Sequence, residues 1–496
     1  MKIRRFFASF LLICACFAWN ISAGAIDDSA PIKVGLTYGS SAAYSYTLSA
    51  SNGFDVGYYA DDSTFVPVYS LMEQSVTVSY SSGNYYVYNS AGAELCVIPQ
   101  DNVALSSSEQ ITASGKNYLG DMMCVARSNG TVNLINVIDI QDYLKGVVPT
   151  EMSSSWPVEA LKAQAVAARN YVLNNLGRHK SEGFDICAAA HCQAYSGCSR
   201  MADNSNRAVD ETDGMVLTYN GKLAQLFYHA SSGGSTENSE NVWVTAYPYL
   251  VAVPTPYETL TEANNGLWTY TVTADELTTY LQSKGYDIGQ VADFYVSKRN
   301  PSGNVHTITV VDTSGKQLDI SKENIILKLS KYFKSFHFDI TGGTTGAQAS
   351  YSVMTGSEPF GNQVDGYYIN GEPADVALED AYILSSGGIA QAGAQDYYVQ
   401  SSSGNQLLQQ ATVQPEPEQP DNNSSNNNNN NSSNNGSTEV VQPSGGTYTT
   451  FTITGRGWGH NVGMSQQSAK GMADNGWTYD QILLHFFPGT TLEKIN

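Results

Sequence analysis

The sequence predicts an α+β protein in which β-rich layers surround one long buried helix. Short runs of β-branched and aromatic residues, separated by Ser, Gly and Asn clusters, occupy the chain from Ile32 to about Val137. One long helical segment follows. The strand-like runs after that helix do not alternate with helices in the β-α-β order of a parallel sheet, which favours α+β organisation.

The composition indicates a folded protein with an acidic surface. Of 496 residues, 42% are hydrophobic, which is enough for about three domains with cores of their own. The chain has 25 Lys and Arg residues and 46 Asp and Glu residues, which gives a net charge of −21. Nucleic acid is excluded as a partner because so little basic surface is available to neutralise phosphates.

The first 25 residues predict an extracytoplasmic protein. Lys2, Arg4 and Arg5 precede an apolar run over 6–19, which ends before the small residues around Ala25. This pattern is typical of a secretory signal. The run is shorter than the ~20 apolar residues of a spanning helix, although an uncleaved signal would still anchor the protein to the outer face of the cytoplasmic membrane.

Each regular element is predicted from its local pattern. Strands are expected where apolar and polar residues alternate, and helices where apolar residues recur at helical spacing between start and stop signals. The clearest strands are 76–80, 85–88 and 132–137, and the helices are expected over 157–176, 275–284 and 479–487.

The helix at 157–176 has small residues on every side. Val158, Leu161, Ala165, Ala168 and Val172 share one face, and the opposite face carries Ala160, Ala163 and Ala167 where a surface helix would have charges. We therefore expect other elements to enclose it.

Two cations lie at the edge of the apolar face of this helix. Lys162 and Arg169 are seven residues apart and therefore nearly in line. Either their stems extend to solvent or they line a cleft that holds an acid or a substrate.

Glu151 is the first candidate for chemistry. It precedes the buried helix, where the helix amino end and the two cations could act on it. A Glu in such a place is commonly a surface group or a cap, but burial in a cleft would make it a catalytic acid. Burial would raise its pKa and cations would lower it, so the residues alone leave the sign open.

A Cys and His cluster follows the helix. Cys187, His191, Cys192 and Cys198 lie close together, with His179 upstream. Thiolate with imidazole is a zinc-type ligand set, although the spacing is not that of a common zinc finger. A disulfide is the alternative, and the residues do not decide between the two.

A Gly- and Ser-rich segment supplies further polar groups around an aromatic residue. It could hold a ligand or be a plain surface turn, and it contains His229, Ser231, Ser232, Glu237, Glu240 and Trp243. No nucleophile elbow, phosphate-binding loop or dinucleotide fingerprint accompanies it.

Four motifs together resemble the stage II sporulation protein D (SpoIID) family, which includes amidase-enhancer relatives. They are DYLKGVVPTEMSSSWPVEALKAQAVAARNYV, CQAYSG, YHASSGGSTENSENVW followed by PYL, and GRGWGHNVGMSQ. The resemblance extends from about Ile32 to the end of the chain, with an insertion. Asn461 departs from it, since Gly is usual there.

The resemblance implies a SpoIID-like fold and a peptidoglycan lytic transglycosylase that prefers peptide-stripped glycan strands. Glu151 would be the catalytic acid and base, with Lys162 and Arg169 beside it. The substrate-binding candidates are Lys162, Arg169, His229, Ser232, Glu237, Glu240 and His460. Some members bind zinc, which favours Cys187, His191 and Cys192 as ligands with His179 as the fourth, in a structural or positioning role.

Such an enzyme needs one carboxylate, because the C6 hydroxyl of muramic acid attacks in place of water and gives a 1,6-anhydro product. Two alternatives remain. The chain could be a non-catalytic cell-wall-binding protein or amidase enhancer, with an amidase as partner, or a water-using muramidase with Glu237 or Glu240 as second carboxylate.

The domain boundaries follow from these assignments. Residues 415–446 are Asn- and Ser-rich and are expected to form a disordered linker. The last segment should pack beside Glu151, because its motif belongs to the family's catalytic domain. The expected units are 1–25 (signal or anchor), 26–137 (β-rich), 138–341 (catalytic core), 342–414 (insertion), 415–446 (linker) and 447–496 (C-terminal part of the catalytic domain).

Overall fold

The computed structural model describes residues 30–262, 264, 266–342 and 450–495, together with four strands between 382 and 408. The expected signal at 1–25, the linker at 415–446 and most of the insertion at 342–414 lie outside the described residues. Within the described part, none of the helices combines the length and the apolar character needed to cross a membrane.

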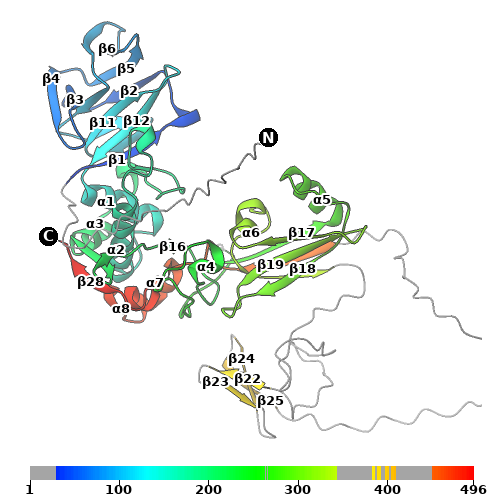
Figure 1. The fold of residues 1–496 in the computed structure, drawn as a ribbon. Helices are drawn as coiled ribbons and strands as arrows, with labels where there is room; N and C mark the ends of the chain where they lie inside the picture. The colour runs from blue at the N-terminus through cyan, green and yellow to red at the C-terminus, as the bar shows by residue number, and fades with distance from the viewer. Residues whose placement is uncertain are drawn as a thin grey trace, which may run out of the picture.

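Two sheets form the amino-terminal lobe, in line with the predicted β-rich region (Figure 1). In one, the order is β13-β1-β12-β11-β8-β3-β4, with bounds Ile186–Cys187, Ile32–Thr37, Val132–Ile138, Asp121–Ala126, Asn102–Ser106, Phe54–Tyr59 and Phe65–Leu71. In the other, the order is β10-β9-β2-β5-β6-β7, with bounds Lys116–Tyr118, Ile111–Ala113, Ser45–Ser49, Ser75–Ser81, Asn84–Asn89 and Glu94–Ile98. The runs predicted at 76–80, 85–88 and 132–137 are confirmed as β5, β6 and β12.

Below this lobe, helices pack around α2 (Val158–Asn174), which is the predicted long helix and is buried along most of its length. Its neighbours are α1 (Ile140–Glu151), α3 (Asp203–Asp210), α7 (Gln466–Asp474), α8 (Tyr479–Phe486) and the strand β14 (Met215–Tyr219). The expectation of β-rich layers around this helix is therefore wrong: mostly helices enclose it, because its alanines let other helices approach closely.

The helix α1 was not predicted, because Gly146 and Pro149 disfavour helix in its second half. Its amino end is capped by Asp139, whose carboxylate accepts hydrogen bonds from the backbone N–H groups of Gln141 and Asp142. Gly146 is required by packing, since a Cβ at this position would lie 2.5 Å from the ring of Tyr195. Glu151 is thus the last residue of a helix.

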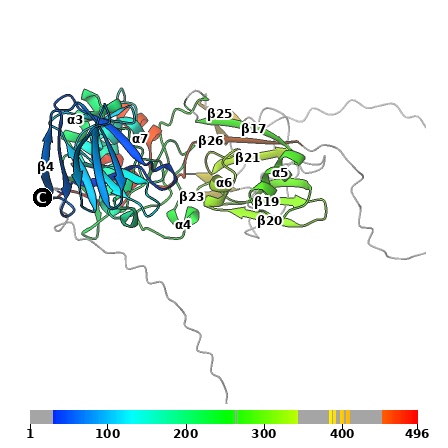
Figure 2. The ribbon, with the colours of Figure 1, turned by 90° about the horizontal axis from the view of Figure 1, so that it is seen from above.

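A second lobe follows in the chain and lies beside the helices (Figures 1 and 2). One of its sheets has the order β17 (Leu267–Thr273), β26 (Thr450–Arg456) and β21 (His337–Gly342). The other has the order β18 (Val291–Arg299), β19 (Val305–Asp312) and β20 (Gln317–Ser321). The predicted helix at 275–284 is confirmed as α5 (Ala274–Ser283), and α6 spans Glu323–Lys328.

The carboxyl-terminal segment joins the second lobe to the helical part. The strand β26 lies between β17 and β21 in the second lobe, β27 (Met464–Ser465) pairs with β16 (Tyr228–His229), and β28 (Thr491–Lys494) pairs with β14. The predicted helix at 479–487 is α8. The remaining short elements are η2 (Gly39–Ser41), η3 (Lys180–Glu182), η4 (Gly197–Arg200), β15 (Lys222–Leu223), α4 (Ser239–Val242) and the hairpin strands β22 (Tyr382–Ser385), β23 (Gly388–Gln391), β24 (Tyr397–Ser401) and β25 (Gly404–Leu408).

Candidate active site

Glu151 is held at the carboxyl end of α1 by two donors from distant parts of the chain. The backbone N–H of Ala194 donates to its Oε1 at 3.0 Å. The side chain of Gln466, at the first position of α7, donates the second hydrogen bond. Gln466 is oriented in turn by Gln164 of α2, whose side-chain oxygen accepts from Gln466 Nε2 at 3.3 Å. The carboxyl-terminal segment therefore lies beside Glu151.

Burial raises the pKa of Glu151 above its ordinary value, and the hydrogen bonds from Ala194 and Gln466, which favour the carboxylate, oppose that rise. No cation is among the groups that shift this pKa. The sequence left open whether the pKa of Glu151 is raised or lowered, and in the structure it is raised. A raised pKa favours a protonated side chain suited to general acid chemistry.

The polar surroundings of Glu151 include the buried Tyr143, the half-buried Tyr228 and Gln193. Tyr143 Oη donates to Gln193 Oε1 at 3.0 Å, and Gln193 Nε2 donates to Tyr228 Oη at 3.1 Å. Burial raises the pKa of both tyrosines, and the nearby Glu151 charge contributes in the same direction. Both phenols therefore stay neutral, and they hold the segment that leads to Ala194.

Lys162 and Arg169 both have polar partners within the described residues. Lys162 Nζ forms ion pairs with Glu159 at 2.8 Å and with Glu211 at 2.7 Å. Arg169 is fully buried, and its guanidinium donates to the carbonyl of Met215 and to the side chain of Gln141. Lys162 thus has acidic partners, as one interpretation of the sequence predicted. Glu159 is on α2, and Glu211 directly follows α3.

His229, Ser232 and His460 lie together. His229 Nε2 is 2.7 Å from Ser232 Oγ, and the rings of His229 and His460 are 5.4 Å apart between centroids. Burial lowers the pKa of both histidines, that of His460 to about 4, so both are neutral at physiological pH. Trp243 packs against His460 with 5.1 Å between ring centroids. The structure therefore joins the third and fourth sequence motifs.

Glu237 and Glu240 have structural partners. Glu237 is 1% exposed and accepts hydrogen bonds from the backbone of Asn238 and from the side chains of Asn241, Asn300 and Ser302. Glu240 accepts from the side chain of Asn238 at 3.2 Å. Both carboxylate oxygens of Glu237 already accept hydrogen bonds within the protein, and these bonds connect loops. We therefore do not expect Glu237 to bind a sugar or to activate water.

Glu258 is a site residue that the sequence did not reveal. Its carboxylate accepts the backbone N–H of Ser232 at 2.7 Å and that of Gly233 at 2.9 Å, as well as the hydroxyl of Ser465. Ser465 is the residue before Gln466. Glu258 therefore ties the loop of His229 to the start of α7, but a single Glu in a loop gives no pattern that would find it.

The predicted metal ligands converge. The donor atoms of His179, Cys187, His191 and Cys192 all lie within 4.8 Å of one another. Cys187 Sγ is 3.7 Å from His191 Nδ1, and Cys192 Sγ is 3.5 Å from both His179 Nε2 and His191 Nδ1. Both cysteines are free thiols, and Cys198 is not part of the cluster.

These distances fit a tetrahedral zinc ion. Bonds of about 2.3 Å to sulfur and about 2.0–2.1 Å to nitrogen place tetrahedral ligands about 3.3–3.8 Å apart. A turn closed by the hydrogen bond from Cys192 N–H to the carbonyl of Ala189 allows the neighbours His191 and Cys192 to face one centre. The hydrogen bond between Cys187 and Cys192 lowers the pKa of the Cys187 thiol, which favours the thiolate that a metal binds.

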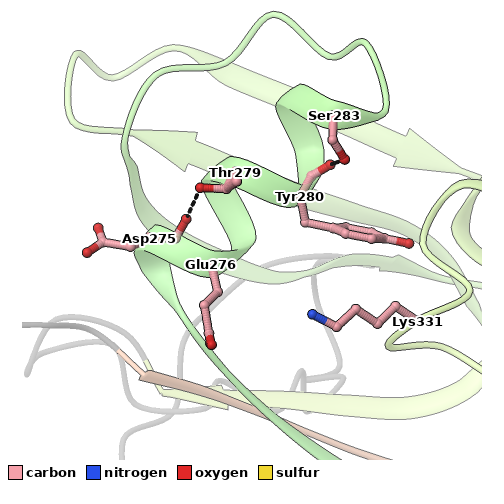
Figure 3. A pocket seen from close by; sticks show the side chains of 6 residues that line it. All are labelled: Asp275, Glu276, Thr279, Tyr280, Ser283 and Lys331. Carbon is pink, nitrogen blue, oxygen red and sulfur yellow. Dashed lines mark hydrogen bonds between the residues drawn. The ribbon is translucent and has the colours of Figure 1, made fainter.

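A surface hollow of about 400 Å³ lies in the second lobe, between α5 and the segment that carries Lys331 (Figure 3). Among the residues that line it are Glu276, Tyr280 and Lys331. None of its residues contacts Glu151 or the four Cys and His residues described above.

Known proteins that are similar in sequence to this chain include members of the family that the four motifs resemble. The chain is 28% identical over 388 residues to the amidase enhancer of Bacillus subtilis (strain 168), which covers 78% of this chain and 45% of that protein. It is 30% identical over 223 residues to stage II sporulation protein D of Bacillus amyloliquefaciens, covering 42% and 62%, and 35% identical over 189 residues to an uncharacterised protein of Brachyspira hyodysenteriae, covering 36% and 51%.

The chain spans about half the length of the curated relatives it matches. Residues 128–219 match the family model described as stage II sporulation protein (SpoIID). That segment contains α1, α2, Glu151 and the four Cys and His residues. The resemblance to the SpoIID family is therefore confirmed over the part of the chain that builds the candidate active site.

Proposed function

We propose that this protein is a peptidoglycan lytic transglycosylase in which Glu151 acts first as general acid and then as general base. The proposal is carried by one observation: Glu151 is a carboxyl group whose pKa is raised by burial while two neutral donors orient it. A protonated carboxyl can donate to the glycosidic oxygen, and the carboxylate that remains can accept the proton of an attacking hydroxyl.

The surroundings of Glu151 favour a reaction with one carboxylate. Glu237 is buried among amide and hydroxyl donors, and Glu258 is bound to two backbone N–H groups and a hydroxyl. Neither acid is among the groups that shift the pKa of Glu151. An external water would need a second carboxylate nearby, whereas the C6 hydroxyl of muramic acid is delivered by the substrate itself.

In this proposal His179, Cys187, His191 and Cys192 hold a zinc ion in a structural role. When bound, zinc would fix the loop that leads from Cys192 to Ala194 and so keep the Ala194 N–H in place. Within this loop, Ala194 orients Oε1 of Glu151, and Gln193 hydrogen-bonds to Tyr143 and Tyr228.

The proposal is tested with peptide-stripped glycan strands. The full chain should release soluble fragments, and Glu151→Gln, which keeps the size of the side chain and removes the acid, should release none above the buffer rate. Circular dichroism must match between the two proteins, and Glu151→Gln must unfold at a temperature no lower than the parent. Equal release by Glu151→Gln would contradict the proposal.

A second function is favoured by the relative that aligns with 78% of this chain and is named amidase enhancer. In that case the protein would bind cell wall and stimulate an amidase. Stimulation would then be unchanged in Glu151→Gln, which separates this function from the enzymatic one.

A further inference from the structure

Trp458 is a rigid aromatic platform at the surface. Its backbone is bonded on both sides to Ser231: Trp458 N–H donates to the Ser231 carbonyl at 2.8 Å, and Ser231 N–H donates back at 3.1 Å. Gly457 and Gly459 have positive φ, and a Cβ at Gly459 would lie 2.6 Å from Cβ of His229. The chain is thus pressed against the His229 loop, while the Trp458 side chain stays 39% exposed.

A lysine lies beside this indole, and an exposed arginine precedes it by two residues in the chain. Lys334 Nζ lies 5.4 Å from the Trp458 ring centroid and 5.3 Å from that of Tyr270. The Lys334 carbonyl accepts the N–H of Gly459 at 2.8 Å, so the same segment positions the lysine and the tryptophan. Arg456 is exposed two residues earlier, and its Cγ lies close to Gly233, 2.9 Å from where a Cβ would be.

Neither Lys334 nor Arg456 takes part in an ion pair within the described residues, in contrast to Lys162. In a chain with 25 basic and 46 acidic residues, Lys334 beside the exposed indole and Arg456 two residues before it are cations without an acidic ion-pair partner, and we call these three residues the patch. Such a patch suits a ligand that offers both an apolar face and an anion.

Backbone hydrogen bonds connect the segment of the patch to the candidate active site. Ser231 pairs with Trp458, and the neighbouring carbonyl of Ala230 accepts the N–H of Gln467 at 2.9 Å. Gln467 follows Gln466, which donates to Glu151. In Figure 2, β26, which ends at Arg456, extends from the second lobe toward α7. A long polymer bound at Glu151 could therefore reach the patch.

We propose that Trp458, Lys334 and Arg456 form a subsite for the peptide-free form of the glycan strand. The indole would stack on the apolar face of a sugar, and the two cations would bind the lactyl carboxylate of N-acetylmuramic acid. That carboxylate is free only after the stem peptide has been removed, since the peptide is attached there as an amide. The subsite thus rests on the proposed function and adds a reason for its substrate preference.

The test uses full-length Glu151→Gln protein, so that binding is measured without cleavage. Two ligands of equal length are compared: peptide-free oligomers of alternating N-acetylglucosamine and N-acetylmuramic acid, and oligomers of N-acetylglucosamine alone. Adding Lys334→Met and Arg456→Gln should weaken binding of the muramic acid ligand about tenfold and should leave the neutral ligand within about twofold. Adding Trp458→Ala should weaken both.

Lys331→Met is the matched control. Lys331 is three residues from Lys334 and has a similar contact, with its Nζ 4.8 Å from the Tyr332 ring, but it faces the hollow of Figure 3. This variant should bind both ligands as the parent does. An equal loss with Lys331→Met, or an equal loss of both ligands in the Lys334 and Arg456 variant, would overturn the subsite.

Failure of the subsite and failure of the proposed function give different results. If the unmodified chain cleaves glycan but the Lys334 and Arg456 variant keeps full affinity, only the subsite is wrong. If no cleavage occurs but affinity depends on these cations and on the lactyl carboxylate, the subsite stands and the enzymatic proposal fails.

Discussion

The backbone N–H of Ala194 donates to Oε1 of Glu151 at 3.0 Å, and Ala194 lies two residues after Cys192. The candidate catalytic acid is therefore oriented by the same loop that supplies two of the four candidate metal ligands. Because the segment from His191 to Ala194 forms no regular secondary structure of its own, its position depends on the Cys and His cluster and on the contacts of Gln193.

Loss of the proposed zinc ion should lower both stability and activity. Protein purified without chelator should contain about one zinc per chain, and Cys192→Ser should lose it. We expect Cys192→Ser to lower the melting temperature and to slow glycan release about tenfold, because the Ala194 donor is no longer held.

Cys198→Ser is the control for this prediction, because Cys198 lies outside the cluster. It should retain zinc and activity. Mass spectrometry of unreduced protein that shows a Cys187–Cys192 disulfide and no zinc would contradict the metal site.

Gln466→Ala should shift the pH dependence of cleavage. The side chain of Gln466 donates to the Glu151 carboxylate and so lowers its pKa; without this hydrogen bond the pKa of Glu151 rises further. Since the acid acts when protonated, the alkaline limb of the kcat/KM profile should move to higher pH, by about 0.5–1 unit.

The neighbouring Gln467 donates through its backbone, so Gln467→Ala should leave that limb in place. A shift of the limb to lower pH in Gln466→Ala would show that the hydrogen bond does not act on Glu151 as described.

Glu151→Gln should be at least as stable as the parent at neutral pH. The folded-state pKa of Glu151 is raised above its unfolded value, so the folded state binds the proton more tightly, and stability falls as the pH rises through this range. A neutral glutamine avoids that cost. Thermal unfolding at several pH values should show the difference at pH 7 and its disappearance below the ordinary pKa of glutamate, about 4.3. A Glu151→Gln protein that is less stable only at neutral pH would contradict the sign of the shift.

Glu258→Ala should destabilise the protein by about 2 kcal/mol or more, because two backbone N–H groups and the Ser465 hydroxyl lose their acceptor together. Glycan release should fall as well, since Ser465 precedes Gln466. Urea denaturation of Glu258→Ala and of Glu262→Ala, an exposed Glu in the same loop, measures the difference. Equal stability of the two variants would refute the bracing role.

Local patterns account for what the sequence predicted correctly. The helices α2, α5 and α8 follow from apolar spacing and end signals, and the alternating strands β5 and β6 from their period of two residues. His179, Cys187, His191 and Cys192 are close enough in sequence for one loop to gather them.

The failures have long-range causes. The helix α1 contains Gly146 because Tyr195 packs closely on it there, a contact that no local pattern reveals. The ion pair of Lys162 with Glu211 joins two parts of the chain that no local pattern connects. Glu258 is recognised only through the three donors that tertiary structure brings to it.

The chemistry of the reducing end tests the central claim most directly. Fragments released from peptide-stripped glycan by the full chain should end in 1,6-anhydro-muramic acid, with no oxygen incorporated from isotopically labelled water, and Glu151→Gln should yield none. Fragments that end in reducing muramic acid carrying the label would contradict a one-carboxylate reaction in which the C6 hydroxyl of the substrate is the nucleophile.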